Sequence, residues 1–80
     1  MRLSVRLFAR YREAAGAPVI EVEVPAGATL AQIWEKVKKQ VPSLAGEARP
    51  LLACDRAYAR PERVVTGTEE IAAFPPVSGG

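Results

Sequence analysis

The amino-acid sequence predicts an α+β fold in which one main helix crosses one face of a mixed β-sheet. Three observations lead to this prediction. Two segments near the start alternate apolar and polar residues with the period of a half-buried strand. One apolar stripe with helical spacing follows them. Short apolar segments separated by turn residues then complete the chain, as expected for further strands.

The two opening segments are typical of a β-hairpin with an enlarged loop. Residues 10–16 between them can form a single helical turn that Gly16 closes. Arginine lies on the outer side of the first strand, and Glu21 and Glu23 lie on that of the second, which favours cross-strand pairing. The residues expected to face inward are Leu3, Val5, Leu7, Ile20, Val22 and Val24.

The helix begins after Thr29, which forms a capping box with Gln32, and ends before Pro42. Its apolar positions follow the i, i+3, i+4, i+7 spacing of a helix with one buried face. Trp34 is expected to be the largest core residue, lying across the sheet. The full apolar stripe is Leu30, Ile33, Trp34, Val37 and Val41.

The remaining strands are predicted from shorter patterns. Residues 51–54 form an apolar strand that Asp55-Arg56 ends as a turn, and residues 70–74 form the last strand. Residues 57–59 and 64–65 are weaker strand candidates. A helix laid across a mixed sheet after an opening hairpin is the β-grasp, or ubiquitin-like, arrangement. We therefore expect a β-grasp domain over residues 1–74 and an extended, flexible C-terminal tail over residues 75–80.

Composition narrows the class of function. The 80 residues fit one small domain, and no apolar stretch approaches the ~20 residues needed to cross a bilayer. A single cysteine favours a reducing, cytoplasmic setting. The net charge of +2 is dispersed, without the basic stripe that nucleic-acid binding requires. There is no histidine and no cluster of acids spaced for a metal, so no metal site is expected.

The sharpest functional feature is the end of the sequence. Pro75-Pro76 favours an extended path, and glycine at positions 79 and 80 lacks a Cβ, so the tip can enter a narrow channel. We expect the chain to stop at a free carboxylate on Gly80, which is the best candidate for a reacting group. The chain would then be a carrier or substrate of enzymes, not a catalyst.

A carboxylate is an anion at neutral pH and must be activated before it accepts a nucleophile. The sequence has no Gly-rich loop with lysine that could bind ATP, so a separate activating enzyme is implied. Cys54 lies in an apolar run with no histidine to activate it, and we interpret it as a buried structural thiol.

Phe8 and Phe74 are further candidates. By alternation each shares the outward side of its strand, so the two rings could form a docking patch for a partner. The alternative is that both rings tuck under the tail or a loop. The pattern alone does not separate these two interpretations.

These residues resemble a known family, the small sulfur-carrier subunit of molybdopterin synthase, often called MoaD. The tail from Phe74 to Gly80, FPPVSGG, matches the FPPV, small hydroxyl residue, Gly-Gly pattern of that family. The opening segment LFARYREAAG is also similar, and the likeness spans nearly the whole chain. One departure is Asp55, where asparagine is expected. The matched opening positions are Phe8, Ala9, Arg12, Glu13 and Gly16.

The resemblance implies a mechanism. An activating enzyme would adenylate the Gly80 carboxylate with ATP, and sulfur from a persulfide donor would replace AMP to leave a thiocarboxylate. The large synthase subunit, in a heterotetramer, would then receive the tail and pass the sulfur to a pterin precursor. This chain would bind no cofactor itself. The residues implied to bind the partner are Phe8, Phe74, Pro75, Pro76, Val77, Ser78 and Gly79.

Two other functions share the fold and the Gly-Gly end. One is a sulfur carrier for thiamine or tRNA thiolation, although such carriers usually lack the Phe-Pro-Pro stem. The other is a ubiquitin-like modifier joined through Gly80 to lysines of target proteins. A third interpretation is a β-grasp interaction module with an incidental tail.

Overall fold

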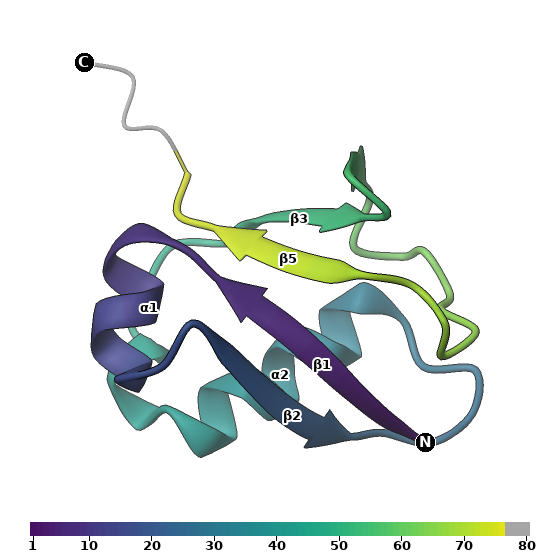
Figure 1. Ribbon diagram of the computed structural model, residues 1–80, viewed down its shortest axis with the longest axis horizontal. Coiled ribbons are helices and arrows are strands. Elements are labelled where there is room, and N and C mark those ends of the chain that lie inside the picture. Colours follow the sequence, from purple (N-terminus) through teal and green to yellow (C-terminus); the bar gives the residue numbers. More distant parts are fainter. Residues whose placement is uncertain (77–80) are drawn as a thin grey trace.

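The computed structural model describes residues 1–76 and shows one mixed five-stranded sheet with a helix packed across it (Figure 1). The sheet order is β2-β1-β5-β3-β4, and the central pair β1 and β5 is parallel while the other neighbours are antiparallel. The strands are β1 (Arg2–Leu7), β2 (Val19–Glu23), β3 (Leu51–Cys54), β4 (Ala57–Ala59) and β5 (Ile71–Phe74). This arrangement confirms the predicted β-grasp fold.

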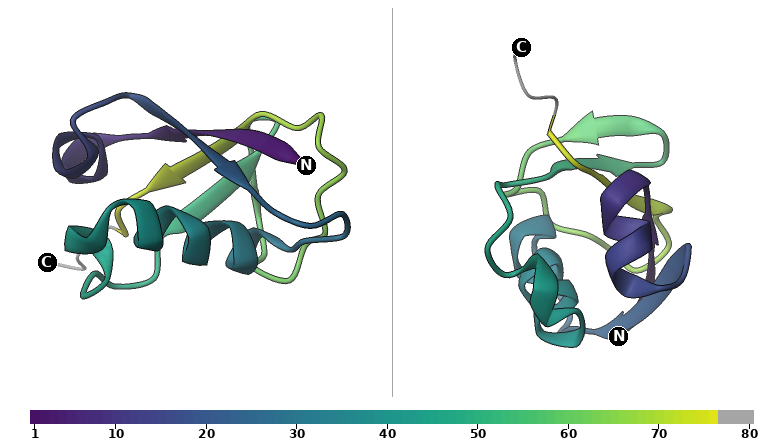
Figure 2. Two further views of the ribbon diagram at one scale, coloured as in Figure 1. Left: turned by 90° about the horizontal axis from the view of Figure 1, so that it is seen from below. Right: turned by 90° about the vertical axis from the view of Figure 1, so that its left-hand side faces the viewer.

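The main helix, α2 (Leu30–Gln40), lies under one face of the sheet (Figure 2). Its capping box forms as predicted: the Gln32 amide donates to Thr29 Oγ1 at 3.3 Å, and the Thr29 amide donates to Gln32 Oε1 at 2.8 Å. Trp34 is buried, which confirms its expected place in the core. A short 3-10 helix, η1 (Pro42–Leu44), follows directly, so Pro42 ends α2 as the sequence predicts.

The hairpin β1–β2 is joined by a second helix, α1 (Ala9–Ala15), which is longer than the single turn expected. Gly16 closes it in the left-handed conformation, with φ of 72°, and donates to the carbonyl groups of Arg12 and Glu13. Arg2 and Glu21 pair across the two strands at 3.2 Å, as the opposite charges of the strands predict.

The core lies between α2 and the sheet. It includes every inward-facing residue predicted for β1, whereas Ile20 of β2 is only partly buried against it. Tyr11 of α1 was not predicted as a core residue, yet it is fully buried and packs on Trp34 with ring centroids 5.0 Å apart. The second weak strand candidate, residues 64–65, was wrong, because Val64 makes only an isolated bridge with Thr29.

Candidate docking surface

One face of the sheet is not covered by α2, and its central row of residues forms a hollow. Strand register places Arg6 of β1 beside Ala72 of β5, Ala72 beside Ala53 of β3, and Ala53 beside Tyr58 of β4. Because the two central residues are alanines and the two outer residues are large, the row is low in the middle and high at both ends. Ala53 is only 5% exposed and lies outside the main core cluster, as expected for the floor of a hollow on the open face.

The next row, toward the tail, is aromatic. The parallel register brings Leu7 beside Ala73, so Phe8 and Phe74, one residue further on, also lie abreast. Their rings stack with centroids 4.5 Å apart and planes 13° apart, and Tyr58 meets Phe74 edge-on at 6.2 Å. Such arrangements contribute about 0.5–1.5 kcal/mol per pair beyond simple burial. The three rings therefore form one cluster, which we call the aromatic cluster.

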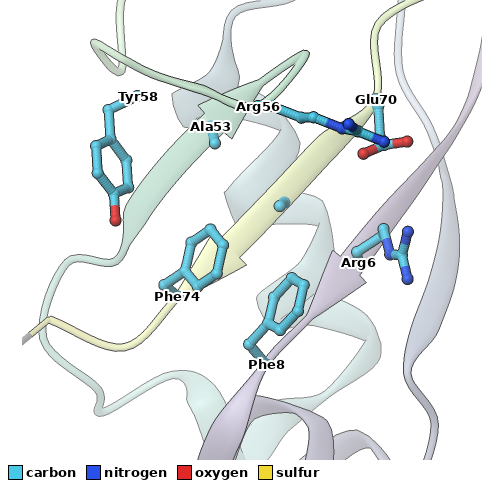
Figure 3. A pocket seen from close by; sticks show the side chains of 8 residues that line it. Arg6, Phe8, Ala53, Arg56, Tyr58, Glu70 and Phe74 are labelled. Carbon is cyan, nitrogen blue, oxygen red and sulfur yellow. The ribbon is translucent and has the colours of Figure 1, made fainter.

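The hollow has a volume of about 320 Å³ and is bounded by aromatic side chains on one side and charged side chains on the other (Figure 3). Its charged groups are the guanidinium groups of Arg6 and Arg56 and the carboxylate of Glu70. Within residues 1–76, neither arginine forms an ion pair. A mostly apolar hollow with a few charged groups at its margin can bind a protruding apolar side chain of another protein.

Phe8 and Phe74 are both half-buried, and their rings stack on each other. They lie on the open face, as their outward alternation predicts, and Phe74 is the last residue of β5. Pro75 and Pro76 are half-buried as well. The other predicted site residues, Val77, Ser78, Gly79 and Gly80, lie outside the residues that the structure describes. A partner-binding role for Phe8 and Phe74 stays a prediction.

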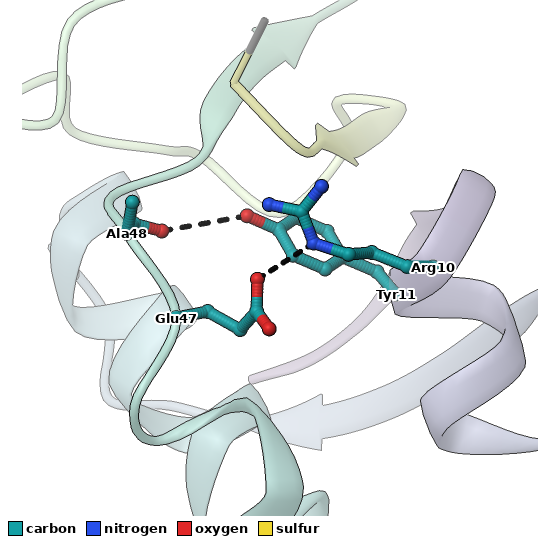
Figure 4. A network of polar contacts seen from close by, with 4 residues as sticks. All are labelled: Arg10, Tyr11, Glu47 and Ala48. Atoms are coloured by element: carbon teal, nitrogen blue, oxygen red, sulfur yellow. Dashed lines mark hydrogen bonds and ion pairs between the residues drawn. The ribbon is translucent and has the colours of Figure 1, made fainter. Parts of the chain in front are cut away.

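A polar network fixes α1 next to this surface (Figure 4). Arg10 Nε donates to Glu47 Oε1 at 2.7 Å, and the Tyr11 hydroxyl reaches the Ala48 carbonyl at 3.5 Å. Burial raises the pKa of Tyr11, so the hydroxyl stays protonated and able to donate. Because α1 starts immediately after Phe8, these two contacts tie the helical turn that follows Phe8 to the 47–48 loop.

Tyr58, Arg6 and Arg56 line the hollow but were not predicted as site residues from the sequence. Tyr58 is 72% exposed and belongs to the aromatic cluster, but its strand has only three residues and its neighbours are alanines. Its alternation with Ala57 and Ala59 was the available signal. Arg6 was assigned to the outer side of β1, and only the sheet order shows that it borders the same hollow as Arg56.

Position 55, where the sequence departs from the resemblance, lies in the turn between β3 and β4. Asp55 and Arg56 have φ of 50° and 70°, the left-handed pair of a two-residue hairpin turn that favours asparagine and glycine. The Asp55 side chain accepts from the Glu70 amide at 2.9 Å, and the Asp55 amide donates to the Glu70 carbonyl at 2.8 Å. Aspartate thus links the turn to the start of β5.

Cys54 is buried on the helix side of the sheet, which confirms that its thiol is structural. Desolvation raises the pKa of this thiol, which opposes formation of a reactive thiolate. Among residues 1–76 there is no group of three potential metal ligands, and no helix of that part is long and apolar enough to cross a membrane.

A β-grasp sheet with an exposed aromatic face next to its C-terminal stem places the chain in the ubiquitin-like class of small proteins. The model of the ThiS family matches residues 5–80, and the chain therefore belongs to the ThiS family.

Individual relatives are consistent with this assignment. A protein of Arabidopsis thaliana described as a molybdopterin synthase sulfur carrier subunit is 34% identical over 82 residues, which span 100% of this chain and 84% of that protein. The structure of a putative molybdopterin converting factor, subunit 1, from Pyrococcus furiosus is 27% identical with a TM-score of 0.86, covering 96% of this chain and 99% of that one. SAMP1 of Haloferax volcanii is 25% identical with the same TM-score, covering 100% of both chains.

Proposed function

We propose that this chain is the sulfur carrier of molybdopterin synthesis. The observation that carries the proposal is the 34% identity, over the whole chain, to a protein described as a molybdopterin synthase sulfur carrier subunit. The match to the ThiS family extends through residue 80 and so includes the Gly-Gly tail. In this role the chain is the non-catalytic small subunit of the synthase, and the catalytic groups belong to its partner.

The proposed chemistry takes place on the Gly80 carboxyl group. Attack of the carboxylate on ATP, held by a separate activating enzyme, forms an acyl-adenylate and releases pyrophosphate. A persulfide then attacks the carbonyl carbon and displaces AMP, which leaves an acyl disulfide. A second thiol then attacks the donor's sulfur in that acyl disulfide, so this thiol is oxidised to a disulfide with the donor and a thiocarboxylate leaves on Gly80. The chain binds no cofactor itself, and ATP serves only the activating enzyme.

The open face and the tail have separate tasks in this proposal. Phe8 and Phe74 dock the large synthase subunit, and residues 75–79 carry the thiocarboxylate into its active site. There the ionised sulfur, a better nucleophile than a carboxylate oxygen, is transferred to a pterin precursor. We propose a cytoplasmic heterotetramer in which two small subunits flank two large ones.

Mass spectrometry of the C-terminal peptide tests the proposal. The chain is incubated with the activating enzyme, ATP and a persulfide donor, and the peptide ending at Gly80 is compared with an untreated sample. We expect one oxygen replaced by sulfur on that peptide. Mapping to the peptide is necessary because oxidation of Met1 changes the mass of the intact chain by nearly the same amount. An unmodified peptide with active enzymes would contradict the proposal.

Substitutions in the tail give a second test. We expect deletion of Gly80, or Gly79→Val, to abolish sulfur transfer to the large subunit. We expect thermal unfolding to stay unchanged, because the buried core of the domain is formed by residues 3–73. Gly46→Val is a matched control, since a Cβ at Gly46 would have no atom within 4 Å. Full transfer by Gly79→Val would argue against a narrow channel in the partner.

One observation favours a second candidate, a protein modifier. SAMP1, whose name stands for small archaeal modifier protein 1, has the same fold as this chain over its full length. A modifier would form an isopeptide bond between Gly80 and target lysines. Immunoblots of native cell extract would then show high-mass conjugates, and a single band at the mass of the free chain would argue for the carrier alone.

A further inference from the structure

Lysine and arginine occupy separate regions of this chain. The lysines are Lys36, Lys38 and Lys39, all on α2, and every basic residue outside α2 is an arginine. Helix propensity does not explain the separation, because lysine and arginine have nearly equal propensities. A general preference of the sequence for arginine does not explain it either, since that preference would also apply to α2. A chemical difference between the two regions is therefore the better explanation.

The basic side chains that border the start of the tail are arginines. Arg6 lines the hollow of the open face together with Phe74, the residue before the Pro75-Pro76 stem. Arg49 lies two residues before Leu51, which pairs with Phe74, so residue 49 and the tail leave the same end of the sheet. Arg10 belongs to the first turn of α1, immediately after the ring that stacks on Phe74.

Other nucleophilic groups are held on the helix side or lack activation. Lys38 lines a hollow that also contains Arg49, but its ammonium group pairs with Glu35 at 2.8 Å. Cys54 is buried between the sheet and α2. The sequence has no histidine that could activate a hydroxyl group such as that of Tyr58. Within residues 1–76, the open face thus presents neither an amine nor a thiol.

We propose that this arrangement protects the activated tail from reaction with its own chain. The inference rests on the proposed function, in which the Gly80 carboxyl group becomes an acyl-adenylate. A neutral lysine amine attacks such a carbonyl carbon, forms a C–N bond, expels AMP and releases a proton to water. The resulting isopeptide would remove the tail from sulfur transfer permanently.

Arginine avoids this side reaction. Its guanidinium group stays protonated at neutral pH, so it has no free electron pair with which to attack the adenylate. Arginine beside the tail therefore supplies positive charge without a competing nucleophile. The persulfide of the donor then remains the acceptor of the activated acyl group. In this way the placement of lysine and arginine contributes to the specificity of the reaction.

The length of the tail determines which positions matter. Residues 75–80 can span at most about 20 Å when fully extended. Position 49 lies within that span, because it is at the end of the sheet where the tail begins. Arg2 lies five residues before Leu7, or about 17 Å along β1, and Leu7 is beside Ala73. Because β1 and β5 are parallel, the tail would have to fold back along the whole sheet to reach Arg2 (Figure 1).

Lysine substitutions next to the tail test the proposal. The wild-type chain and its Arg49→Lys and Arg6→Lys variants are incubated with the activating enzyme and ATP, without a persulfide donor. Mass spectrometry of the digested chains then detects the loss of one water and locates the new link. Arg2→Lys is the matched control, since it keeps the charge beside Glu21 but lies far from the tail. Hydroxylamine in parallel samples converts the adenylate to a hydroxamate, which measures activation, and thermal unfolding verifies that each variant is folded.

We expect Arg49→Lys to form about tenfold more internal isopeptide with Gly80 than the wild type, because a short tether gives an effective amine concentration on the order of millimolar. Arg6→Lys should also exceed the wild type, and Arg2→Lys should match it. Equal yields in all four chains, with hydroxamate formed, would overturn the inference and leave the carrier function intact. No hydroxamate from the wild type, and no thiocarboxylate when the donor is added, would overturn the carrier function and the inference together.

Discussion

The two faces of the sheet have the same strands but opposite surfaces. On the helix side, alternate residues of β1 and β5 are apolar and buried under α2, as Val5 and Ile71 show. On the open side, the intervening residues give an alanine floor, a partly exposed aromatic cluster and a basic edge. The comparison shows that one face accounts for stability, while the other keeps apolar surface in contact with solvent and so available for a partner.

Backbone conformation also differs between the two sides of the sheet. Three residues other than glycine have positive φ among residues 1–76: Ala9, Asp55 and Arg56. Ala9 follows Phe8 of the aromatic cluster, and the other two form the turn at the charged end of the hollow. On the helix side, by contrast, α2 begins with a regular capping box. Strained backbone conformations thus adjoin the proposed docking surface. Such strain is commonly found at functional sites.

The comparison is tested most strongly by removing a large ring from the helix side. We expect Trp34→Ala to lower the free energy of unfolding by about 3–5 kcal/mol, because it leaves a cavity between α2 and the sheet. Denaturant unfolding measures this change. A loss below about 1 kcal/mol would show that Trp34 is not a main core residue.

The matched substitution on the open side is Tyr58→Ala. Because Tyr58 is 72% exposed and its loss removes mainly the edge-on contact with Phe74, we expect the free energy of unfolding to fall by only about 0.5–1 kcal/mol. Binding to the large subunit should weaken by about 2 kcal/mol, or about 30-fold in Kd. Unchanged binding with normal folding would remove Tyr58 from the docking surface.

The positive φ of Ala9 predicts a smaller change in the free energy of unfolding, and in this case a stabilising one. Ala9 has φ of 51°, which costs an alanine more than a glycine, so Ala9→Gly should stabilise the fold by about 1 kcal/mol. Ala14→Gly, in an exposed position of the same helix with no positive φ, should instead destabilise it by about 0.5–1 kcal/mol. Thermal unfolding of both variants checks the difference. Equal losses in the two would show that Ala9 is unstrained.

The smallest expected effect concerns pH and lies outside the docking surface. Backbone amides of Thr66 and Gly67 donate to Glu69 and lower the pKa of its carboxyl from 4.5 to about 2. Because the folded-state pKa is depressed, this stabilisation is present above pH 4.5 and is lost as pH falls toward 2. Glu69→Gln should therefore reduce the loss of stability over that interval in acid unfolding curves. An unchanged acid limb would contradict the role of Glu69.

Patterns along the chain were sufficient to predict most of the fold. The alternation in β1 and the stripe and capping box of α2 are local features, and the structure has them where the sequence places them. Tyr11 was missed because only the third dimension brings α1 over Trp34. The same reason explains the missed part of the docking surface. Arg6, Tyr58 and Phe74 belong to three different strands, and no local sequence pattern predicts the order of those strands in the sheet.

The central claim is that the open face, and not the helix face, meets the large synthase subunit. Nuclear magnetic resonance of the isotope-labelled chain, titrated with the unlabelled large subunit, tests it most directly. We predict that backbone signals of Phe8, Tyr58 and Phe74 and of residues 75–80 shift or broaden, while those of α2 stay unchanged. Changes concentrated on the exposed residues of α2, with the open face unaffected, would contradict the account.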